Sequence, residues 1–134
     1  MPAELPKPDP VVIAAYLDDV DGELDAVTRL MAEPVSRFAA FHLQQAAEKL
    51  VKAVRLHRGL HATADHNVAA LIEDLPPTDL WRAKLLPLGP LSAYATAYRY
   101  PSPGGKRKPG PSADELRAWI ARIRPLVVEA RSSL

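Results

Sequence analysis

Apolar side chains recur along this chain at alternating steps of three and four residues, which is the spacing of one face of an α-helix. The first such stripe lies between residues 11 and 31 and consists of Ile13, Leu17, Val20, Leu24, Val27 and Met31. It predicts a helix of about five turns. Gly22 lowers the local helix propensity by up to about 1 kcal/mol relative to alanine, but the stripe continues on both sides of it.

A second stripe predicts the central helix of a bundle within residues 34–59. Its members are Ala40, Leu43, Ala47, Leu50 and Val54, and Gly59 is a natural stop for this helix. Phe38 and Phe41, near the start of the stripe, are interpreted as core residues. The link Ala32-Glu33-Pro34 is short, so we expect the first two helices to form an antiparallel hairpin.

The remaining segments predict shorter helices and one more long helix. The third helix has Val68, Leu71, Ile72 and Leu75 on its inner face and ends before Pro76-Pro77. We expect Thr63 or Asp65 to cap it and Thr78 to cap the next helix. The sequence indicates that Pro87 and Pro90 divide that fourth region into two pieces or kink it sharply.

The last helix begins at a capping box formed by Ser112 and Glu115, and its inner stripe consists of Leu116, Trp119, Ile120, Ile123 and Val127. We expect a bend at Pro125. No segment shows the period-two pattern of a strand. The sequence therefore predicts an all-α fold, an up-and-down helical bundle of four to five helices.

Length and composition indicate one domain, residues 11–134, preceded by a flexible arm over residues 1–10, where four of ten residues are proline. The chain has no cysteine, so it has no disulfide framework and no thiolate zinc site. It also has no apolar run of membrane length and no cleavable leader pattern. We expect a cytoplasmic protein without a membrane segment.

The net charge of +1 conceals an uneven distribution. Residues 1–33 contain two basic and eight acidic side chains, net −6, and residues 34–134 contain fifteen and eight, net +7. The basic part can attract phosphates. Asp18, Asp21 and Asp25 form an acidic row on the first helix, which is interpreted as a solvated face or a contact for a basic partner, because no further ligands complete a cation shell.

Polar side chains follow a second line around the central helix: His42, Gln45, Lys49 and Lys52. Glu48 lies four residues before Lys52, an arrangement that favours a helical ion pair. One interpretation is a solvated helix face. The other is a half-buried binding groove, because His42 and Gln45 follow the two phenylalanines.

Two segments of the chain, the run FHLQQAAEKLVKAVRLHRG at residues 41–59 and Tyr98-Arg99-Tyr100-Pro101, match motifs of a known family. The first resembles the signature helix, and the second the Arg-Tyr-Pro element, of the HEPN (higher eukaryotes and prokaryotes nucleotide-binding) domain family. Residues 63–68 stand where many members have a Thr-His-Asp-Leu helix start, but here the aspartate precedes the histidine. The resemblance covers residues 10–131.

The resemblance implies a helical bundle that often forms homodimers and is frequently encoded beside a minimal nucleotidyltransferase, in a toxin–antitoxin-like pair. HEPN domains act either as metal-independent ribonucleases or as non-catalytic binders of nucleotides or RNA. The ribonuclease branch uses an arginine followed by a histidine after four to six residues. Here no histidine follows Arg99, because His42, His57, His61 and His66 all precede it.

Three hypotheses follow for the function. The first is a non-catalytic module that binds a nucleotide or RNA and acts with a minimal nucleotidyltransferase, and its binding residues are His42, Gln45, Glu48, Lys49, Lys52, Arg99 and Tyr100. The second is a ribonuclease toxin that uses Arg55 and His61, which have five residues between them but lie on either side of Gly59. The third is a purely structural dimerisation module.

No cofactor or metal is expected in any of these hypotheses. His57 and His61 are four residues apart, the spacing of metal ligands on a helix, but Gly59 lies between them and they lack a paired acidic ligand. We expect no metal site at this position.

Overall fold

The computed structural model describes residues 7–134 except residues 62, 64, 99, 102, 107 and 108 and the side chain of Ala95. The chain has three long helices, α1 (Pro10–Leu30), α2 (Ala39–His57) and α6 (Ala113–Ser133). Between α2 and α6 it forms the shorter helices α3 (Val68–Glu73), α4 (Leu80–Leu85) and α5 (Tyr94–Ala97). A 3₁₀ segment, η1 (Leu86–Ala93), connects α4 to α5. No strand occurs in these described residues. The prediction of an all-α helical bundle is confirmed.

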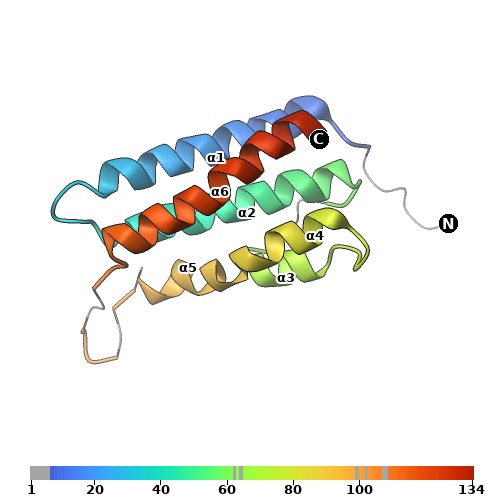
Figure 1. The fold of residues 1–134 in the computed structure, drawn as a ribbon. Coiled ribbons are helices and arrows are strands. Elements are labelled where there is room, and N and C mark those ends of the chain that lie inside the picture. Colours follow the sequence, from blue (N-terminus) through green and yellow to red (C-terminus); the bar gives the residue numbers. More distant parts are fainter. Residues whose placement is uncertain (1–6, 62, 64, 99, 102, 107–108) are drawn as a thin grey trace.

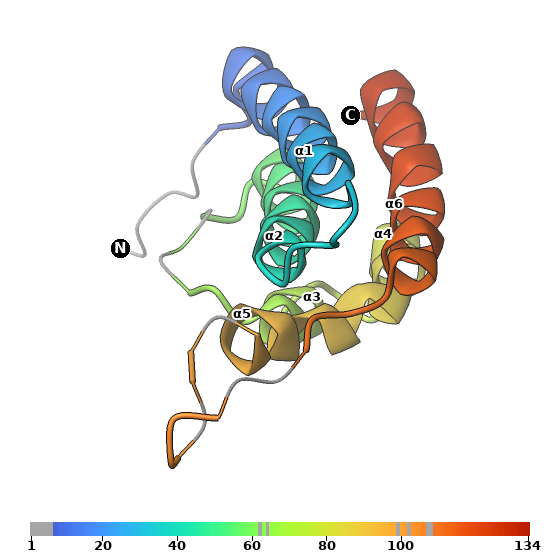
Figure 2. The same cartoon turned by 90° about the vertical axis from the view of Figure 1, so that its left-hand side faces the viewer.

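Helix α2 is the centre of the bundle. It runs antiparallel to α1, and α6 lies beside both of them (Figure 1). Seen along the helices, α1 and α6 are on one side of α2, and α3 and α5 are on the opposite side (Figure 2). Because α2 also contacts η1 and α5, most of its circumference is covered by other parts of the chain.

The predicted apolar stripes form the core. The inner faces of α1 and α2 meet through side chains such as Leu17, Leu24, Leu43 and Leu50, all of which are buried. Trp81 also belongs to this core. The prediction of a buried Phe38 is wrong: its side chain lies just before the first turn of α2, is 49% exposed, and has the guanidinium of Arg37 4.5 Å from its ring.

Side chains cap four of the helices. Asp9 accepts from the amide of Val11 at the start of α1, and Ser112 accepts from that of Glu115 at the start of α6, as predicted for the capping box. The caps expected at α3 and α4 are displaced, to Asn67 and to Asp79. Polar residues stand next to each other at both places, so local sequence alone does not select between them.

Prolines lie both between helices and inside one. Pro87 and Pro90 lie in the 3₁₀ segment that separates α4 from α5, which confirms the predicted interruption. Helix α6 continues through Pro125 to Ser133 as one element, and the bend expected at Pro125 stays a prediction. The expected flexible arm includes residues 1–6, which lie outside the described part of the chain.

The end of α2 is tied to the start of α4 by an ion pair between Arg58 and Asp79. Nε of Arg58 donates to Oδ2 of Asp79 at 2.6 Å, and Nη2 donates to Oδ1 at 3.1 Å. Asp79 Oδ1 also accepts from the amide of Trp81 at 2.9 Å, so one carboxylate caps α4 and binds α2. These hydrogen bonds, above all the one from Arg58, hold the pKa of Asp79 below its usual value.

Gly110 marks a close approach between the segment before α6 and the start of α2. A β-carbon at this position would lie 2.6 Å from Cα of Arg37. Because that neighbour is backbone, it cannot move aside without shifting α2. We expect Gly110→Ala to lower the free energy of unfolding by about 1–3 kcal/mol, measured by urea denaturation. Gly22→Ala is the control, since a β-carbon there has nothing within 4 Å, and it should be neutral or slightly stabilising.

In the described part of the chain, no helix is both long and apolar enough to span a bilayer.

Candidate functional site

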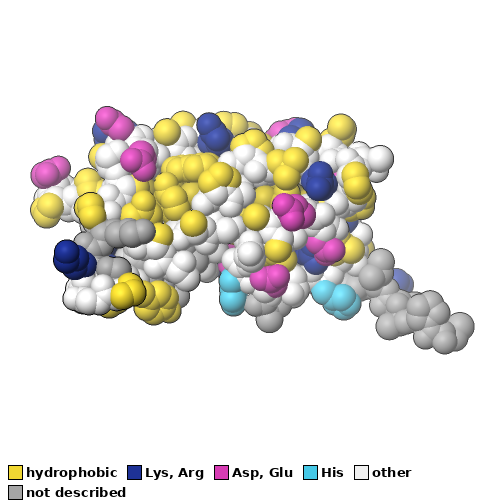
Figure 3. Space-filling model, turned by 90° about the horizontal axis from the view of Figure 1, so that it is seen from below, with side chains coloured by type: hydrophobic (Ala, Val, Ile, Leu, Met, Phe, Trp, Pro, Cys, Tyr) yellow, Lys and Arg dark blue, Asp and Glu magenta, His cyan; other side chains and the backbone are white. Residues whose placement is uncertain are grey.

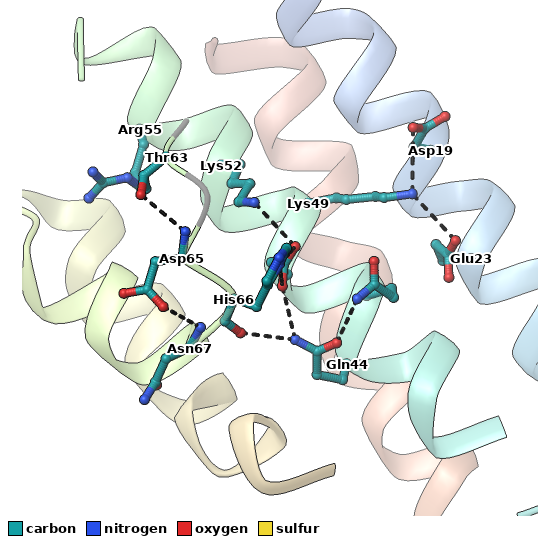
Figure 4. A network of polar contacts seen from close by, with 12 residues as sticks. Asp19, Glu23, Gln44, Lys49, Lys52, Arg55, Thr63, Asp65, His66 and Asn67 are labelled. Carbon is teal, nitrogen blue, oxygen red and sulfur yellow. Dashed lines mark hydrogen bonds and ion pairs between the residues drawn. The ribbon is translucent and has the colours of Figure 1, made fainter. Parts of the chain in front are cut away.

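The predicted polar line of α2 is divided between two surroundings. One edge faces α1, where Nδ1 of His42 lies 2.9 Å from a carboxylate oxygen of Glu23. The ammonium of Lys49 lies 3.4 Å from Glu23 and 3.6 Å from Asp19. His42 and Lys49 are therefore placed opposite carboxylates of the acidic helix, and Figure 4 shows Lys49 reaching toward them. The positive charge of Lys49 is largely neutralised there.

The other edge of α2 faces the segment between α2 and α3 and is buried. Gln44 has no exposed surface, and the side chains of Glu48 and Lys52 are only 5% and 8% exposed. Since charged side chains are rarely buried unless they are paired, these residues are expected to satisfy one another. The interpretation as a solvated face is wrong for Lys52.

Glu48 is the centre of this buried network. Its carboxylate accepts from Nε2 of Gln44 at 3.1 Å and pairs with the ammonium of Lys52 at 3.3 Å, which confirms the predicted helical ion pair. Nδ1 of His66 lies 3.1 Å from Oε1 and 3.2 Å from Oε2 of the same carboxylate. Gln45 donates to Oε1 of Gln44 at 2.9 Å, so the polar groups of the network are hydrogen-bonded to each other (Figure 4).

The segment that leads to His66 is held at both of its ends. Nε2 of Gln44 donates to the carbonyl of His66 at 3.2 Å, and Nε of Arg55 donates to the carbonyl of His61 at 3.3 Å. Between them Thr63 has a φ of 54°, a conformation that non-glycine residues rarely adopt. Asp65 accepts from the amide of Asn67 at 2.9 Å. These contacts give His66 a defined position on the surface.

The imidazole of His66 is the exposed end of the network. Its side chain is 72% exposed although Nδ1 contacts a buried carboxylate. A hydrogen bond from Nδ1–H to Glu48 leaves Nε2 free to accept a proton or, in the imidazolium form, to donate to an anion. Seen from below, the molecule carries histidine side chains with carboxylates beside them (Figure 3). His66 is the residue through which the buried network meets solvent.

Arg55 and His61, the predicted ribonuclease pair, lie close together in space. The contact between them joins the side chain of Arg55 to the backbone carbonyl of His61 and does not involve the imidazole. The guanidinium of Arg55 is buried and binds the carbonyls of His61 and Leu71 and the carboxylate of Asp74, the last at 2.8 Å. The His61 residue is exposed. This guanidinium is engaged in joining α2 to α3, with three acceptors around it.

Tyr100, another predicted binding residue, follows the end of α5 and is 57% exposed. Arg99 lies outside the described residues. That Arg99 binds the same ligand as the polar residues of α2 therefore stays a prediction. Nearby, Tyr94 packs edge-on against Tyr98, and burial raises the pKa of the Tyr98 phenol.

Sequence reasoning missed two members of the network. Gln44 adjoins the predicted Gln45, and only packing shows that Gln44 is the buried one. His66 was part of the third family motif but was not assigned to a site. The signal that points to it is the match of that motif to a Thr-His-Asp-Leu helix start, which places a histidine just before α3.

The acidic row of α1 is paired within the chain. Asp18 and Asp21 both contact Nη2 of Arg131 on α6, at 3.0 and 2.7 Å, and Asp25 contacts Nε of Arg29 at 3.1 Å. This row therefore lies opposite basic side chains of the same molecule. Within the described residues, no group of three or more histidine or acidic side chains has the arrangement of a metal site.

The fold and the network define a class of protein: an all-α bundle whose central helix carries a Gln-Gln-Ala-Ala-Glu-Lys run facing the segment before the third helix. The family model described as HEPN domain matches residues 17–131. The chain belongs to the HEPN domain family.

Comparison with solved structures gives a similar fold. The crystal structure of TT1696 from Thermus thermophilus superposes with a TM-score of 0.68, covers 91% of this chain and 98% of that chain, and is 23% identical in sequence. At this identity the likeness concerns the fold alone. Comparison with curated proteins gives no match.

Proposed function

We propose that this chain is a non-catalytic HEPN module that binds a nucleotide or RNA and acts with a minimal nucleotidyltransferase. The observation that carries the proposal is the exposed imidazole of His66, which is held by a buried carboxylate and lies on a segment whose two ends are hydrogen-bonded to α2. Such a group is preorganised, so little conformational entropy is lost when a ligand binds to it. The site comprises His66 together with Gln44, Gln45, Glu48 and Lys52.

The chemistry of this site suits a phosphate. In the imidazolium form, His66 donates from Nε2 to a phosphate oxygen, while Glu48 accepts from Nδ1 and stabilises the positive charge. The nearby charges of Glu48 and Lys52 cancel, so the imidazolium leaves the network with one positive charge. Exposed Tyr100, at the far end of α5, offers a ring on which a base of a longer RNA can stack.

Binding is favoured over cleavage by the position of Arg55. Metal-independent cleavage of RNA needs a cation at the charged phosphorane, together with a base and an acid on the same phosphate. The guanidinium of Arg55 is buried and already engaged with Asp74 and two carbonyls. A phosphate at the ring of His61 would therefore not find this guanidinium free.

The nucleotidyltransferase partner rests on family membership, since HEPN domains are frequently encoded beside such an enzyme. The test is to express the chain together with the product of the neighbouring gene, if that gene encodes a minimal nucleotidyltransferase. Co-elution of the two chains in size-exclusion chromatography is the expected result. Separate elution at micromolar concentrations would contradict this part of the proposal.

Replacement of His66 by alanine should weaken ligand binding by at least about tenfold, because it removes a charge-assisted hydrogen bond to phosphate. The measurement is fluorescence anisotropy with a labelled single-stranded RNA of mixed sequence and, separately, with labelled ATP, at low salt. His61→Ala is the matched control, since His61 is an exposed histidine of the same segment. The affinity of His61→Ala for the RNA and for ATP should equal that of the wild type. Thermal unfolding should confirm that both variants are folded.

Two outcomes would contradict this proposal. Fragmentation of total RNA by the purified protein in the presence of a chelator, with loss of activity in His61→Ala, would support the ribonuclease instead. Absence of binding by the wild-type protein, with a dimer in sedimentation experiments, would support a purely structural module.

A further inference from the structure

A hollow lies where the end of α1 passes α6. This groove has a volume of about 750 Å³, an apolar floor formed by Met31, Ile120 and Ala121, and a rim with Arg29, Arg117 and Arg124. We call it the α1–α6 groove. Figure 2 shows the two helices side by side.

The three arginines of the rim are available to a partner. Arg29 and Arg117 pair with Asp25 and Asp114 on their own helices, but all four side chains are more than 60% exposed. Ion pairs of this kind contribute little and exchange readily. Arg124 forms no ion pair with any residue that the structure describes. An apolar floor with three cations around it attracts an apolar surface that is flanked by carboxylates.

A second copy of this chain does not offer such a surface on its acidic helix. Asp18 and Asp21 bind Arg131, and Asp19 lies beside Lys49 within the same molecule. Docking α1 of another copy would require these pairs to exchange in both molecules, whereas the unpaired carboxylates of another protein meet no such competition. The groove therefore fits a different protein better than a second copy of α1.

We propose that the α1–α6 groove binds an acidic amphipathic helix of a partner protein. Arg117 and Arg124 are seven residues apart on α6, which places them two turns, about 10 Å, apart along the helix. Carboxylates two turns apart on a partner helix match this spacing. The apolar face of that helix covers Met31, Ile120 and Ala121, and the flexible side chain of Met31 adapts to it. The groove acts independently of ligand binding at His66.

The test uses two synthetic helical peptides of about four turns, each with leucines along one face. The first has glutamates flanking the leucines, and the second has lysines at the same positions. Isothermal titration calorimetry with the full chain should show binding of the glutamate peptide and at least about tenfold weaker binding of the lysine peptide. The affinity for the glutamate peptide should fall as salt is added.

Charge reversal supplies the decisive variant. The double substitution of Arg117→Glu and Arg124→Glu should lower the affinity for the glutamate peptide by at least about tenfold and raise the affinity for the lysine peptide. Arg122→Glu is the matched control, because Arg122 lies on the same helix but its guanidinium is 5.2 Å from the Trp119 ring, away from the groove lining. That variant should bind both peptides as the wild type does.

Three results would overturn the proposal. Equal affinity for both peptides would show that the charges of the rim do not discriminate between an acidic and a basic helix. An unchanged preference in the double variant would place binding elsewhere on the surface. Self-association of the wild-type protein in sedimentation velocity, lost in the double variant, would identify a second copy as the occupant.

Discussion

Replacement of Glu48 by alanine is expected to lower the free energy of unfolding by about 3–5 kcal/mol, the range for removing one partner of a buried ion pair. The loss is large because Lys52, only 8% exposed, would keep a positive charge without its carboxylate. Gln44 would also lose the acceptor that its amide contacts at 3.1 Å. Urea unfolding followed by circular dichroism at pH 7 measures the effect.

Two further variants separate the charge from the packing. Lys52→Met should cost less than Glu48→Ala, because Glu48 would keep its contacts with Gln44 and His66. The double variant Glu48→Leu with Lys52→Met replaces both charges by apolar groups of similar size and should recover much of the lost stability. A loss below about 1 kcal/mol in Glu48→Ala would mean that the ammonium of Lys52 reaches solvent, and that the network is not the buried unit described above.

Replacement of Asp79 by alanine should have the next largest effect on stability, roughly 3 kcal/mol. It removes the cap of α4 and both hydrogen bonds to Arg58, which tie α4 to the end of α2. The side chain of Asp79 is 8% exposed, so water does not replace these contacts in the folded protein. Asp25→Ala is the control, because its pair with Arg29 is exposed and should contribute less than about 1 kcal/mol.

The same carboxylate should make stability depend on pH in acid. Its pKa is lower in the folded protein than the unfolded value of 3.8, mainly through the hydrogen bond from Arg58. Stability from this group is therefore fully present above about pH 4 and is lost as the pH falls through the folded pKa. Urea unfolding from pH 7 to pH 2 should show a weaker acid dependence in Asp79→Asn than in the wild type. An identical dependence would show that other carboxylates are responsible.

The two polar edges of α2 suggest a division of roles along one helix. His42 and Lys49 hold α1 against α2 through Glu23 and Asp19. The edge around Glu48 instead positions His66. Residues of one periodic polar line thus have two roles, packing against α1 and positioning His66. The expectation that the whole line forms a binding groove is replaced by the proposal that the edge around Glu48 supports a binding histidine.

The helices were predictable from the sequence because their causes are local. A stripe such as Leu17, Val20 and Leu24 buries one face of a helix wherever the partner lies, and Ser112 satisfies free amides three residues further on. Phe38 was misplaced because its burial depends on what covers the start of α2. In the structure Phe38 stays 49% exposed, with the guanidinium of Arg37 4.5 Å from its ring.

The sequence by itself determined that this chain is a bundle of helices, which ones are long, and, through its motifs, the HEPN family to which it belongs. Only the tertiary structure decided that Gln44 and Glu48 are buried and that His66 closes their network at the surface. The physical reason is distance along the chain. Glu48 and His66 are 18 residues apart, so their contact depends on how the segment after α2 folds back, which no helical period records.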